Sequence, residues 1–501
     1  MFRNCSGLAS LNLVDSGVAA TPHGRMRFVL PILLLVLGWP LMASAQPFTA
    51  DEQRQADALV EAALARSKVP SVSVAVVRGG ELAYVKAYGQ AELEPTRAAD
   101  TKARYDIGSV SKQFTATLLL KLVDEGRVGL DDPVGRYLPG VTAGDRITVR
   151  QLLSQISGYV NYWRVDFLPP SMRQDTAPQA IVDRWGRAPL GFEPGAQWQY
   201  SNTNYVLAGR IVEVVEGRPL GALLEERLFR PLGMTSARFG PPRPEGSDAA
   251  GYTRVLLGPN RRAEVVPQGW TFGAGGLSMT AEDLARWDLG MLRKRLLSPG
   301  GYAAQQAEAR LTDGSGSGYG LGVYVGDANG HRVISHDGAS MGFVAQNRVY
   351  PDDGLAIVVL VNADYGGASN EVAEGLQTML LGPIPAPVTP AAAVPPRARP
   401  VHAETTELAR RIFDDLAAGR LEEARFTPDG LSYFTARTRA DLTSSLTALG
   451  PPARFDLMTH GPWAGFDGSI HEIGWADRTL VLIMFRADDG RLEEYYLFSP
   501  D

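Results

Sequence analysis

The sequence predicts an α+β protein in which an antiparallel sheet is flanked by helices and joined to a helical lobe, with a small α+β domain after it. Three observations carry this prediction. Strand-like runs lie near both ends of residues 46–382, the residues between them are mostly helical and loop-rich, and a Pro/Ala-rich segment at 383–400 precedes a separate region, 401–501, with its own helix and strands.

Composition limits the classes of function. The chain has 501 residues, 45% of them hydrophobic and 21% charged, with a formal net charge of −6. This is typical of a soluble globular protein of two or three domains. Because there is no basic stripe, we expect no nucleic-acid partner. After the N-terminus no apolar run is long enough to span a membrane, so we expect no membrane association of the processed chain.

Residues 1–45 have the pattern of a signal peptide. A basic flank, "RMRF", precedes the apolar run "FVLPILLLVLGWPLM", and "ASA" supplies small residues for cleavage after Ala45. Prolines and a glycine interrupt the apolar run, which disfavours an uncleaved anchor. The residues before Met26 do not resemble a signal-peptide n-region, so translation from Met1 and from Met26 are both open. The prediction is a periplasmic or secreted protein.

Cysteine content agrees with a catalyst that needs no thiol. The only cysteine is Cys5, inside the predicted signal peptide. The processed chain therefore has no disulfide, no cysteine nucleophile and no thiolate metal ligand. An exported chain without cysteine favours a bacterial periplasm.

The strands of residues 46–382 follow from alternating apolar runs and turn residues. "SVSVAVVRGGELAYVKAYG" predicts a hairpin around Gly79 and Gly80. Four later runs predict strands within 319–327, 331–338, 342–351 and 354–364, and "SNEVAEGLQTMLL" predicts a helix at 369–381. The two strand groups are expected to pair, with a cleft between the sheet and the lobe.

The last hundred residues form the predicted accessory domain. The Pro/Ala-rich segment favours an extended linker. After it, "ETTELARRIFDDLAAGRLEEA" predicts an amphipathic helix at 404–424, and strand-like runs lie within 478–490 and 491–500. We find no catalytic constellation there, so we expect this domain to cover the cleft or to contact a partner.

The stretch "YDIGSVSKQFTA" places Ser109 three residues before Lys112 at the start of a predicted helix. In the simplest reading, Ser109 caps the helix and Lys112 is solvated. The alternative is a nucleophile and its base, because residues three apart share a helix face. Lowering a lysine pKa from about 10.4 to about 7 costs roughly 4–5 kcal/mol. A helix N-terminus supplies only ~0.3–1 kcal/mol, so burial or another cation has to supply the rest.

Two later motifs complete a recognisable set. "YSNTNYVLAG" contains Tyr200 and Asn202, and "SHDGASMGF" contains His336 and Gly338. Ser-x-x-Lys, Tyr-x-Asn and a third motif ending in glycine, in this order, resemble the serine β-lactamase and penicillin-binding-protein superfamily. The chain is most similar to its β-lactamase-related serine hydrolases, which include class C β-lactamases, D-alanyl-D-alanine carboxypeptidases, D-aminopeptidases and esterases.

Two further stretches support the resemblance, which covers about Phe48 to Gly382. "ITVRQLLSQISGY" resembles the family's "LLxHxSGL" segment, although Gln155 and Ile156 replace the usual His-Thr. "GAGGLSMTAEDLARW" resembles its glycine turn before a helix. The resemblance implies a β-lactamase/transpeptidase-like fold.

The resemblance also implies roles for matching residues. Ser109 would be the acylated nucleophile and Lys112 its proton partner, and Tyr200 would be a second proton carrier, as a phenolate if the site lowers its pKa. Asn202 would hold the substrate carbonyl or amide. The backbone N–H groups of Ser109 and Ala339 would form the oxyanion hole. Which residue deprotonates Ser109 stays open.

The third motif bears on the substrate, and His336 and Gly338 are expected to bind it. Lactam-processing members usually have Lys-Thr-Gly, whereas this chain has His336-Asp337-Gly338. Losing the lysine should weaken binding of a substrate carboxylate by about 1–3 kcal/mol. The prediction is therefore hydrolysis of an amide or ester, in a D-amino-acid peptide, a cell-wall-type peptide or a small ester, through an acyl-serine. The alternative is a β-lactamase or D-alanyl-D-alanine carboxypeptidase.

Other classes fit less well. No His-Glu-x-x-His spacing occurs, which disfavours a zinc hydrolase, and we expect neither a metal nor another cofactor. There is no Gly-x-Ser-x-Gly elbow around Ser109. A non-catalytic module that binds cell-wall or peptide ligands stays as an alternative of another class, although such a binder would not need Lys112. The sequence does not determine the acyl group or the oligomeric state.

Overall fold

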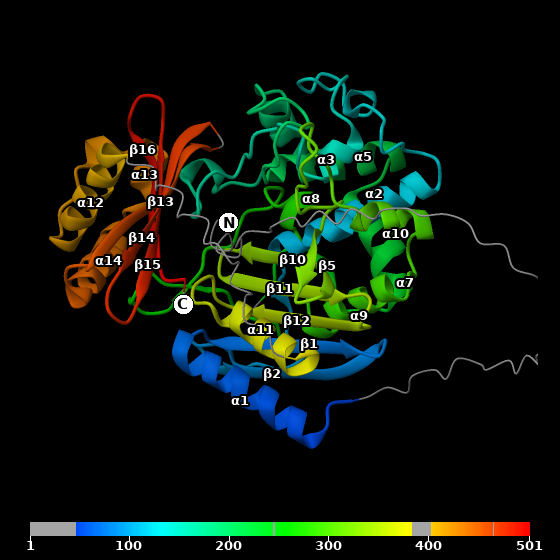
Figure 1. Cartoon of the computed structure of the whole chain (residues 1–501), viewed down its shortest axis with the longest axis horizontal. Coiled ribbons are helices and arrows are strands. Elements are labelled where there is room, and N and C mark those ends of the chain that lie inside the picture. The colour runs from blue at the N-terminus through cyan, green and yellow to red at the C-terminus, as the bar shows by residue number, and fades with distance from the viewer. Residues whose placement is uncertain (1–46, 244–245, 383–401, 464, 501) are drawn as a thin grey trace, which may run out of the picture.

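The structure, a computed structural model, describes residues 47–243, 246–382, 402–463 and 465–500 (Figure 1). The predicted signal peptide (1–45) and linker (383–400) lie outside these residues. The helices before the linker are α1 (Ala50–Ser67), α2 (Ser111–Asp124), α3 (Val149–Leu153), α4 (Pro178–Ile181), α5 (Asn202–Glu216), α6 (Leu220–Leu224), α7 (Arg230–Leu232), α8 (Phe272–Gly275), α9 (Ala281–Leu292), α10 (Pro299–Gln306) and α11 (Ala368–Leu381). The strands there are β1 (Ser71–Arg78), β2 (Glu81–Glu92), β3 (Arg97–Ala98), β4 (Tyr105–Asp106), β5 (Arg238–Phe239), β6 (Tyr252–Thr253), β7 (Arg261–Arg262), β8 (Leu277–Met279), β9 (Tyr324–Ala328), β10 (His331–Ser340), β11 (Phe343–Tyr350) and β12 (Leu355–Val361).

The main sheet joins the two strand groups, as the sequence predicts. Its order is β3-β2-β1-β12-β11-β10-β9, and the neighbours in it are antiparallel. The two groups meet where Val74 of β1 pairs with Val359 of β12. β12 is a continuous apolar run, and β1 is buried along almost its whole length although it contains Ser71 and Ser73, because helices cover both faces of the sheet at its centre.

Helices cover both faces of the sheet (Figure 1), and each face has its own apolar core. α1 and α11 cover one face, where Val72, Val74 and Val76 point. The intervening residues, including Ala75 and Val77, face α2, α9 and the helical lobe. Since successive strand residues alternate between faces, the run at β1 supplies both cores. The core on the α2 side of the sheet fixes the position of α2 and, with it, the Ser-x-x-Lys motif.

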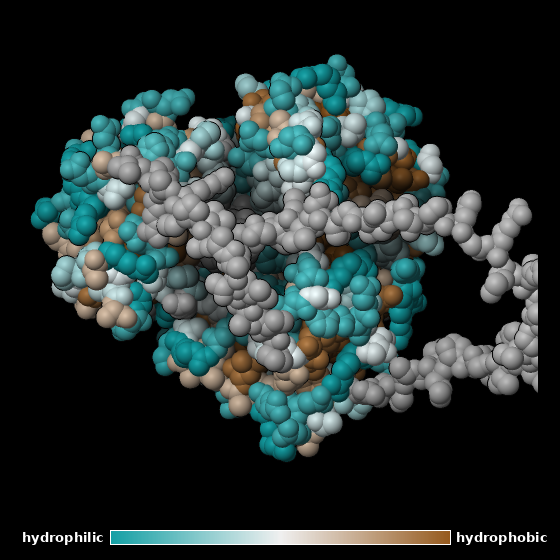
Figure 2. All heavy atoms as spheres, viewed as in Figure 1, coloured by the Kyte–Doolittle hydropathy of each residue, from teal (hydrophilic) through white to brown (hydrophobic). Residues whose placement is uncertain are grey.

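The accessory domain has the predicted initial helix and late strands. Its elements are α12 (Ala403–Ala417), α13 (Pro428–Tyr433), α14 (Ala436–Leu449), β13 (Arg454–Trp463), β14 (Phe466–Gly474), β15 (Thr479–Arg486) and β16 (Leu492–Phe498). The strands form an antiparallel meander in the order β13-β14-β15-β16. α12 and α14 pack on one face of this sheet in a separate apolar core. On the face shown in Figure 2, hydrophilic residues predominate over this domain and over the lobe.

Two details of the sequence prediction are wrong. The strand expected from residue 319 begins only at Tyr324, because Gly318 and Gly322 have positive φ and turn the chain. The helix expected to reach residue 424 ends at Ala417, just before Gly419, which also has a positive φ. The short strands β5 to β8 within the lobe lacked a detectable pattern, since strands of two or three residues have no periodicity.

None of the helices in the described ranges is long and apolar enough to cross a bilayer.

Candidate active site

Ser109 lies in a 3-10 turn, η2 (Gly108–Val110), that leads directly into α2. Gly108 has φ +49°, and a Cβ there would lie 2.7 Å from the backbone nitrogen and oxygen of Ala339. Only glycine satisfies both conditions. The turn therefore presses against β10 and points Ser109 into the cleft between sheet and lobe.

Lys112 is fully buried, with 0% of its surface exposed. Its Nζ lies 2.9 Å from Ser109 Oγ, 2.9 Å from Asn202 Oδ1 and 2.6 Å from the carbonyl oxygen of Ala274. The solvated-lysine alternative is thus wrong. A neutral amine suits these three partners, because it can donate to the two oxygens that only accept and accept the proton of the Ser109 hydroxyl.

Burial lowers the pKa of Lys112 well below its ordinary value, against the opposing effect of the Asp337 carboxylate. Lys112 needs such desolvation to act as a base, and the sequence alone could not show it. The structure therefore places an amine with a depressed pKa one hydrogen bond away from a serine hydroxyl.

Tyr200 completes the immediate surroundings of the serine. Its phenol donates to Ser109 Oγ at 2.6 Å, and Lys112 Nζ lies 4.7 Å from the ring centroid. Burial raises the pKa of Tyr200 well above its ordinary value. The condition for a phenolate, a lowered pKa, is therefore not met, and the raised pKa favours the neutral phenol.

Replacing Tyr200 by phenylalanine should slow modification of Ser109 by a fluorophosphonate probe by about 10²-fold, because general acid–base groups contribute on that order. Tyr205→Phe is the matched control. Tyr205 belongs to α5, which begins two residues after Tyr200, and its phenol donates to the carbonyl oxygen of Leu153 at 2.7 Å. Second-order rate constants of labelling measure the effect. Equal rates in both variants would contradict a role for the Tyr200 phenol.

Two residues that sequence reasoning missed hold this site together. Asn161 Oδ1 accepts from the backbone N–H of Asn202 at 3.0 Å and from its side chain at 3.1 Å. Gln155 Oε1 accepts from the N–H of Ser201 at 3.0 Å and from Asn204 Nδ2 at 2.6 Å. Gln155 occupies the position that departs from the family pattern, and that departure was the available signal. Asn161 gave none.

The end of β10 forms one wall of the pocket beside Ser109. Ala339 lines the pocket beside Gly108 and Ser109. A Cβ on Gly338 would lie 2.0 Å from the carbonyl oxygen of Ile107 and 3.2 Å from the Ser109 nitrogen. Glycine is thus required at Gly338 for close backbone approach. The predicted oxyanion-hole amides, from Ser109 and Ala339, belong to segments in direct contact.

His336 lies behind this wall, with 1% of its surface exposed. Its Nε2 lies 2.9 Å from the Tyr319 hydroxyl, and its Nδ1 lies 2.6 Å from the carbonyl oxygen of Asp337. Burial lowers the pKa of His336 to about 4, so the imidazole is neutral at neutral pH. His336 is not among the residues that line the pocket. His336 thus supports the wall from behind, and direct substrate binding by His336 stays a prediction.

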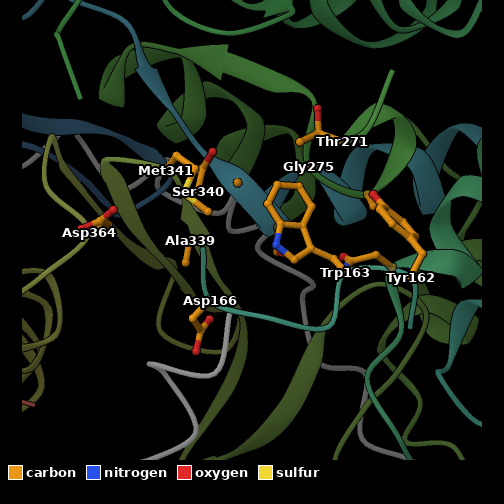
Figure 3. Close-up of a pocket in the computed structure, with 13 residues that line it drawn as sticks. Tyr162, Trp163, Asp166, Thr271, Gly275, Ala339, Ser340, Met341 and Asp364 are labelled. Carbon is orange, nitrogen blue, oxygen red and sulfur yellow. The ribbon is translucent and has the colours of Figure 1, made fainter. Parts of the chain in front are cut away.

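The pocket around Ser109 is lined by aromatic and acidic side chains (Figure 3). Figure 3 shows Tyr162 and Trp163 on one side and Ser340, Met341 and Asp364 on the other. Asp166 lies at one end. The lining residues are Gly108, Ser109, Tyr162, Trp163, Asp166, Asn202, Thr271, Ala274, Gly275, Ala339, Ser340, Met341 and Asp364. This set has two carboxylates and no cationic side chain, so the pocket favours a positively charged ligand.

The accessory domain contacts the loop that carries Asp166, in keeping with the role expected for it. Glu494 of β16 is fully buried and accepts from the backbone N–H of Asp166 at 2.6 Å. Nearby, the rings of Phe167 and Tyr433 lie 5.3 Å apart. The accessory domain therefore braces one end of the pocket from outside.

Burial, and then the Asp166 carboxylate, raise the pKa of Glu494 well above its ordinary value of 4.5. The folded protein thus favours the neutral acid, so wild-type stability should fall as pH rises above 4.5 toward this raised pKa. Glu494→Gln keeps the acceptor without the charge, and its melting temperature should equal or exceed that of the wild type at pH 8. Glu494→Ala leaves a buried N–H unpaired and should lose about 1–3 kcal/mol. Thermal unfolding at pH 5 and 8 tests this. A melting temperature of Glu494→Gln below that of Glu494→Ala would contradict it.

Comparison with known proteins agrees with this geometry. The family model described as Beta-lactamase matches residues 56–378, more than half of the chain. The chain belongs to the beta-lactamase family. In the described part of the chain, no group of three or more His, Cys, Asp or Glu side chains is placed to hold a metal ion.

Relatives of this beta-lactamase family member include D-aminopeptidases. That of Brucella anthropi is 31% identical over 323 residues, which cover 63% of this chain and 60% of the relative. That of Brucella canis is 30% identical over 338 residues, covering 66% of this chain and 63% of the relative. The chain thus spans less than two thirds of the length of these curated relatives.

Solved structures show the same fold. A D-stereospecific amidohydrolase from Streptomyces sp. is 29% identical with a TM-score of 0.57, over 66% of this chain and 98% of that one. A D-amino acid amidase from Ochrobactrum anthropi SV3, complexed with D-phenylalanine, is 24% identical with a TM-score of 0.60, over 66% and 99% of the two chains. An octameric penicillin-binding protein homologue from Pyrococcus abyssi is 20% identical with a TM-score of 0.57, over 89% and 100%.

Proposed function

We propose that this protein is a serine amide hydrolase that releases D-amino acids from amides or short peptides with a free α-ammonium group. The observation that carries this proposal is the contact of Ser109 Oγ with both Lys112 Nζ and the Tyr200 phenol, in a pocket lined by carboxylates. Similarity to D-aminopeptidases and to a D-stereospecific amidohydrolase supports the amide bond and the D configuration.

The first half of the reaction forms the acyl-enzyme. The neutral Lys112 amine takes the proton of Ser109, and the serine oxygen bonds to the substrate carbonyl carbon. The developing oxyanion accepts from the backbone N–H groups of Ser109 and Ala339. When the intermediate collapses, the C–N bond breaks and the Lys112–Tyr200 pair returns one proton to the leaving nitrogen. In this proposal Asn202 orients the substrate amide.

The second half restores the serine. A water molecule gives up a proton to the same pair and attacks the ester carbonyl. The bond between Ser109 Oγ and the acyl carbon then breaks, the serine recovers a proton, and the amino acid leaves. Both halves use the same two proton carriers, so one arrangement of Lys112 and Tyr200 serves acylation and deacylation.

Charge in the pocket favours an ammonium over a carboxylate. Asp166 and Asp364 line the pocket, and none of its lining residues in the described part of the chain is basic. His336, at the position of the lactam-binding lysine, is neutral and buried. Penicillins and D-alanyl-D-alanine peptides present a free carboxylate near the reacting bond. The Asp166 and Asp364 carboxylates would repel such substrates, so β-lactamase and carboxypeptidase activity should be minor.

A substrate panel tests this proposal. D-alanine p-nitroanilide should be hydrolysed with kcat/KM at least about 10²-fold above its N-acetyl derivative, because a buried charge left without its counter-charge costs about 3–5 kcal/mol. L-Alanine p-nitroanilide, p-nitrophenyl butyrate and a chromogenic cephalosporin complete the panel. Faster turnover of the cephalosporin or of the N-acetyl compound would overturn the assignment.

Asp166→Asn identifies the source of the preference. It should reduce the ratio between the free and acetylated anilides while retaining fluorophosphonate labelling of Ser109. Glu264→Gln, which alters an exposed carboxylate away from the pocket lining, is the control. An unchanged ratio in Asp166→Asn would exclude this carboxylate as the ammonium partner.

We also infer export to the periplasm or beyond the cell, from the signal-peptide pattern at residues 1–45. N-terminal sequencing of protein recovered from the periplasm should begin at Gln46. A sequence that retains the apolar run would contradict cleavage after Ala45.

A further inference from the structure

Asp106, at the end of β4, joins two segments of the active site through its side chain. Its Oδ1 accepts from the backbone N–H of Gly108 at 2.7 Å, and its Oδ2 accepts from the Ser340 hydroxyl at 3.1 Å. Gly108 belongs to the turn that carries the nucleophile, and Ser340 is the last residue of β10. One carboxyl group therefore spans the junction between the turn and the sheet.

The partners of Asp106 adjoin the two proposed oxyanion-hole donors. Ser109 follows Gly108 directly, and Ala339 directly precedes Ser340. Two amides stabilise an oxyanion only if both point at the same place, with donor–acceptor distances near about 2.7–3.1 Å. A group that ties the neighbours of both amides controls their spacing.

Backbone contact alone brings these segments together but does not prevent them from sliding. Gly108 and Gly338 permit close approach because neither carries a Cβ. The described hydrogen bonds of the Asp106 carboxyl run to one residue on each side of this contact. We propose that Asp106 is a positioning residue that sets the relative placement of the Ser109 and Ala339 amides through its hydrogen bonds to Gly108 and Ser340.

This inference rests on the proposed amide-hydrolase function, because it assigns the hydrogen bonds of Asp106, called the tie below, to the positioning of an oxyanion hole. Asp106 is assigned a positioning role because both described hydrogen bonds of its carboxyl run to other residues of the site, Gly108 and Ser340. The tie does not require a negative charge. A protonated acid, or the amide of asparagine, can accept from the Gly108 N–H with its carbonyl oxygen and donate to the Ser340 oxygen. Burial raises the pKa of Asp106 to about 7, so the neutral form is well populated at neutral pH.

The test compares Asp106→Ala, Asp106→Asn and Ser340→Ala with wild-type protein on D-alanine p-nitroanilide. Asp106→Ala should lower kcat by about 10–10²-fold and change KM less than about twofold, because it affects interactions made in the transition state. Asp106→Asn should keep kcat within about threefold of the wild type, since its amide rebuilds both hydrogen bonds. The rate of Ser109 labelling by a fluorophosphonate should fall in parallel with kcat.

A double-mutant cycle tests the link to Ser340. If both residues act through one tie, the double variant Asp106→Ala/Ser340→Ala should be no slower than Asp106→Ala alone. If the kcat losses of Asp106→Ala and Ser340→Ala multiply in the double variant, the proposal is wrong. Equal kcat values for Asp106→Ala and wild type would also overturn it. Equal damage by Asp106→Asn and Asp106→Ala would also overturn it. Failure of the proposed function looks different, because the wild-type protein would then not hydrolyse the D-anilide at all.

Discussion

Replacing Ser109 by alanine should abolish both hydrolysis of D-alanine p-nitroanilide and covalent labelling by a fluorophosphonate. The bond that forms the acyl-enzyme is made by Ser109 Oγ, which contacts Lys112 Nζ and the Tyr200 phenol. Removing the nucleophile from a unit of cooperating groups typically costs about 10⁶-fold in kcat. Intact-mass spectrometry should show one adduct on the wild-type protein and none on Ser109→Ala.

Ser247→Ala is the matched control, because it removes an exposed serine hydroxyl that does not line the pocket. It should label at the wild-type rate. The Ser109→Ala protein should retain its fold, since the lost hydroxyl leaves the apolar core unchanged. An adduct of unchanged stoichiometry on Ser109→Ala would mean that another residue is the nucleophile.

Lys112→Met should lower kcat/KM by about 10²–10⁴-fold, the range expected for a general base. Methionine is unbranched and similar in length, so it fills the same volume without an amine. Steady-state kinetics on D-alanine p-nitroanilide measure the loss. Lys121→Met, a partly buried lysine on the same helix whose Nζ donates to the carbonyl oxygen of Leu296 at 3.0 Å, is the control and should keep wild-type activity.

The pH dependence gives Lys112 a second, independent test. Because burial lowers its pKa in the folded state, protonation is disfavoured on folding. The wild-type free energy of unfolding should therefore fall as pH decreases from the ordinary lysine value of 10.5 toward the lowered pKa. Lys112→Met should lack this contribution. The acid limb of the wild-type kcat/KM profile should likewise lie well below pH 10.5.

A stability–pH curve of Lys112→Met that runs parallel to that of the wild type would contradict a depressed pKa. Retention of wild-type kcat/KM by Lys112→Met would assign proton abstraction elsewhere, with Tyr200 as the remaining neighbour of the Ser109 hydroxyl.

Local pattern was enough for much of the fold. The run at β12 is apolar over its whole length and the run at β1 is mostly apolar, and the chain alternates strand-rich and helix-rich regions, so the antiparallel sheet with paired ends was predictable. Helix ends were less predictable. α12 stops at Ala417 because the chain turns at Gly419, although charged and apolar residues continue the helical pattern beyond it.

The residues of the candidate site were likewise only partly predictable. Motif order singled out Ser109, Lys112, Tyr200 and Asn202, and the structure brings their side chains together. The supporting residues Asn161 and Asp106 have no sequence signature, and Gln155 has only its departure from the family pattern, because their roles depend on hydrogen bonds to residues distant in the chain or in another segment.

Residue type and order therefore establish which groups this protein brings to its reaction: a serine, a lysine and a tyrosine, with histidine replacing the lysine of the third motif. Their protonation states depend on the tertiary structure. Burial lowers the pKa of Lys112 and raises that of Tyr200, which favours the neutral amine in one and the neutral phenol in the other. The physical reason is desolvation, which depends on every residue packed around a charge and which no short stretch of sequence contains.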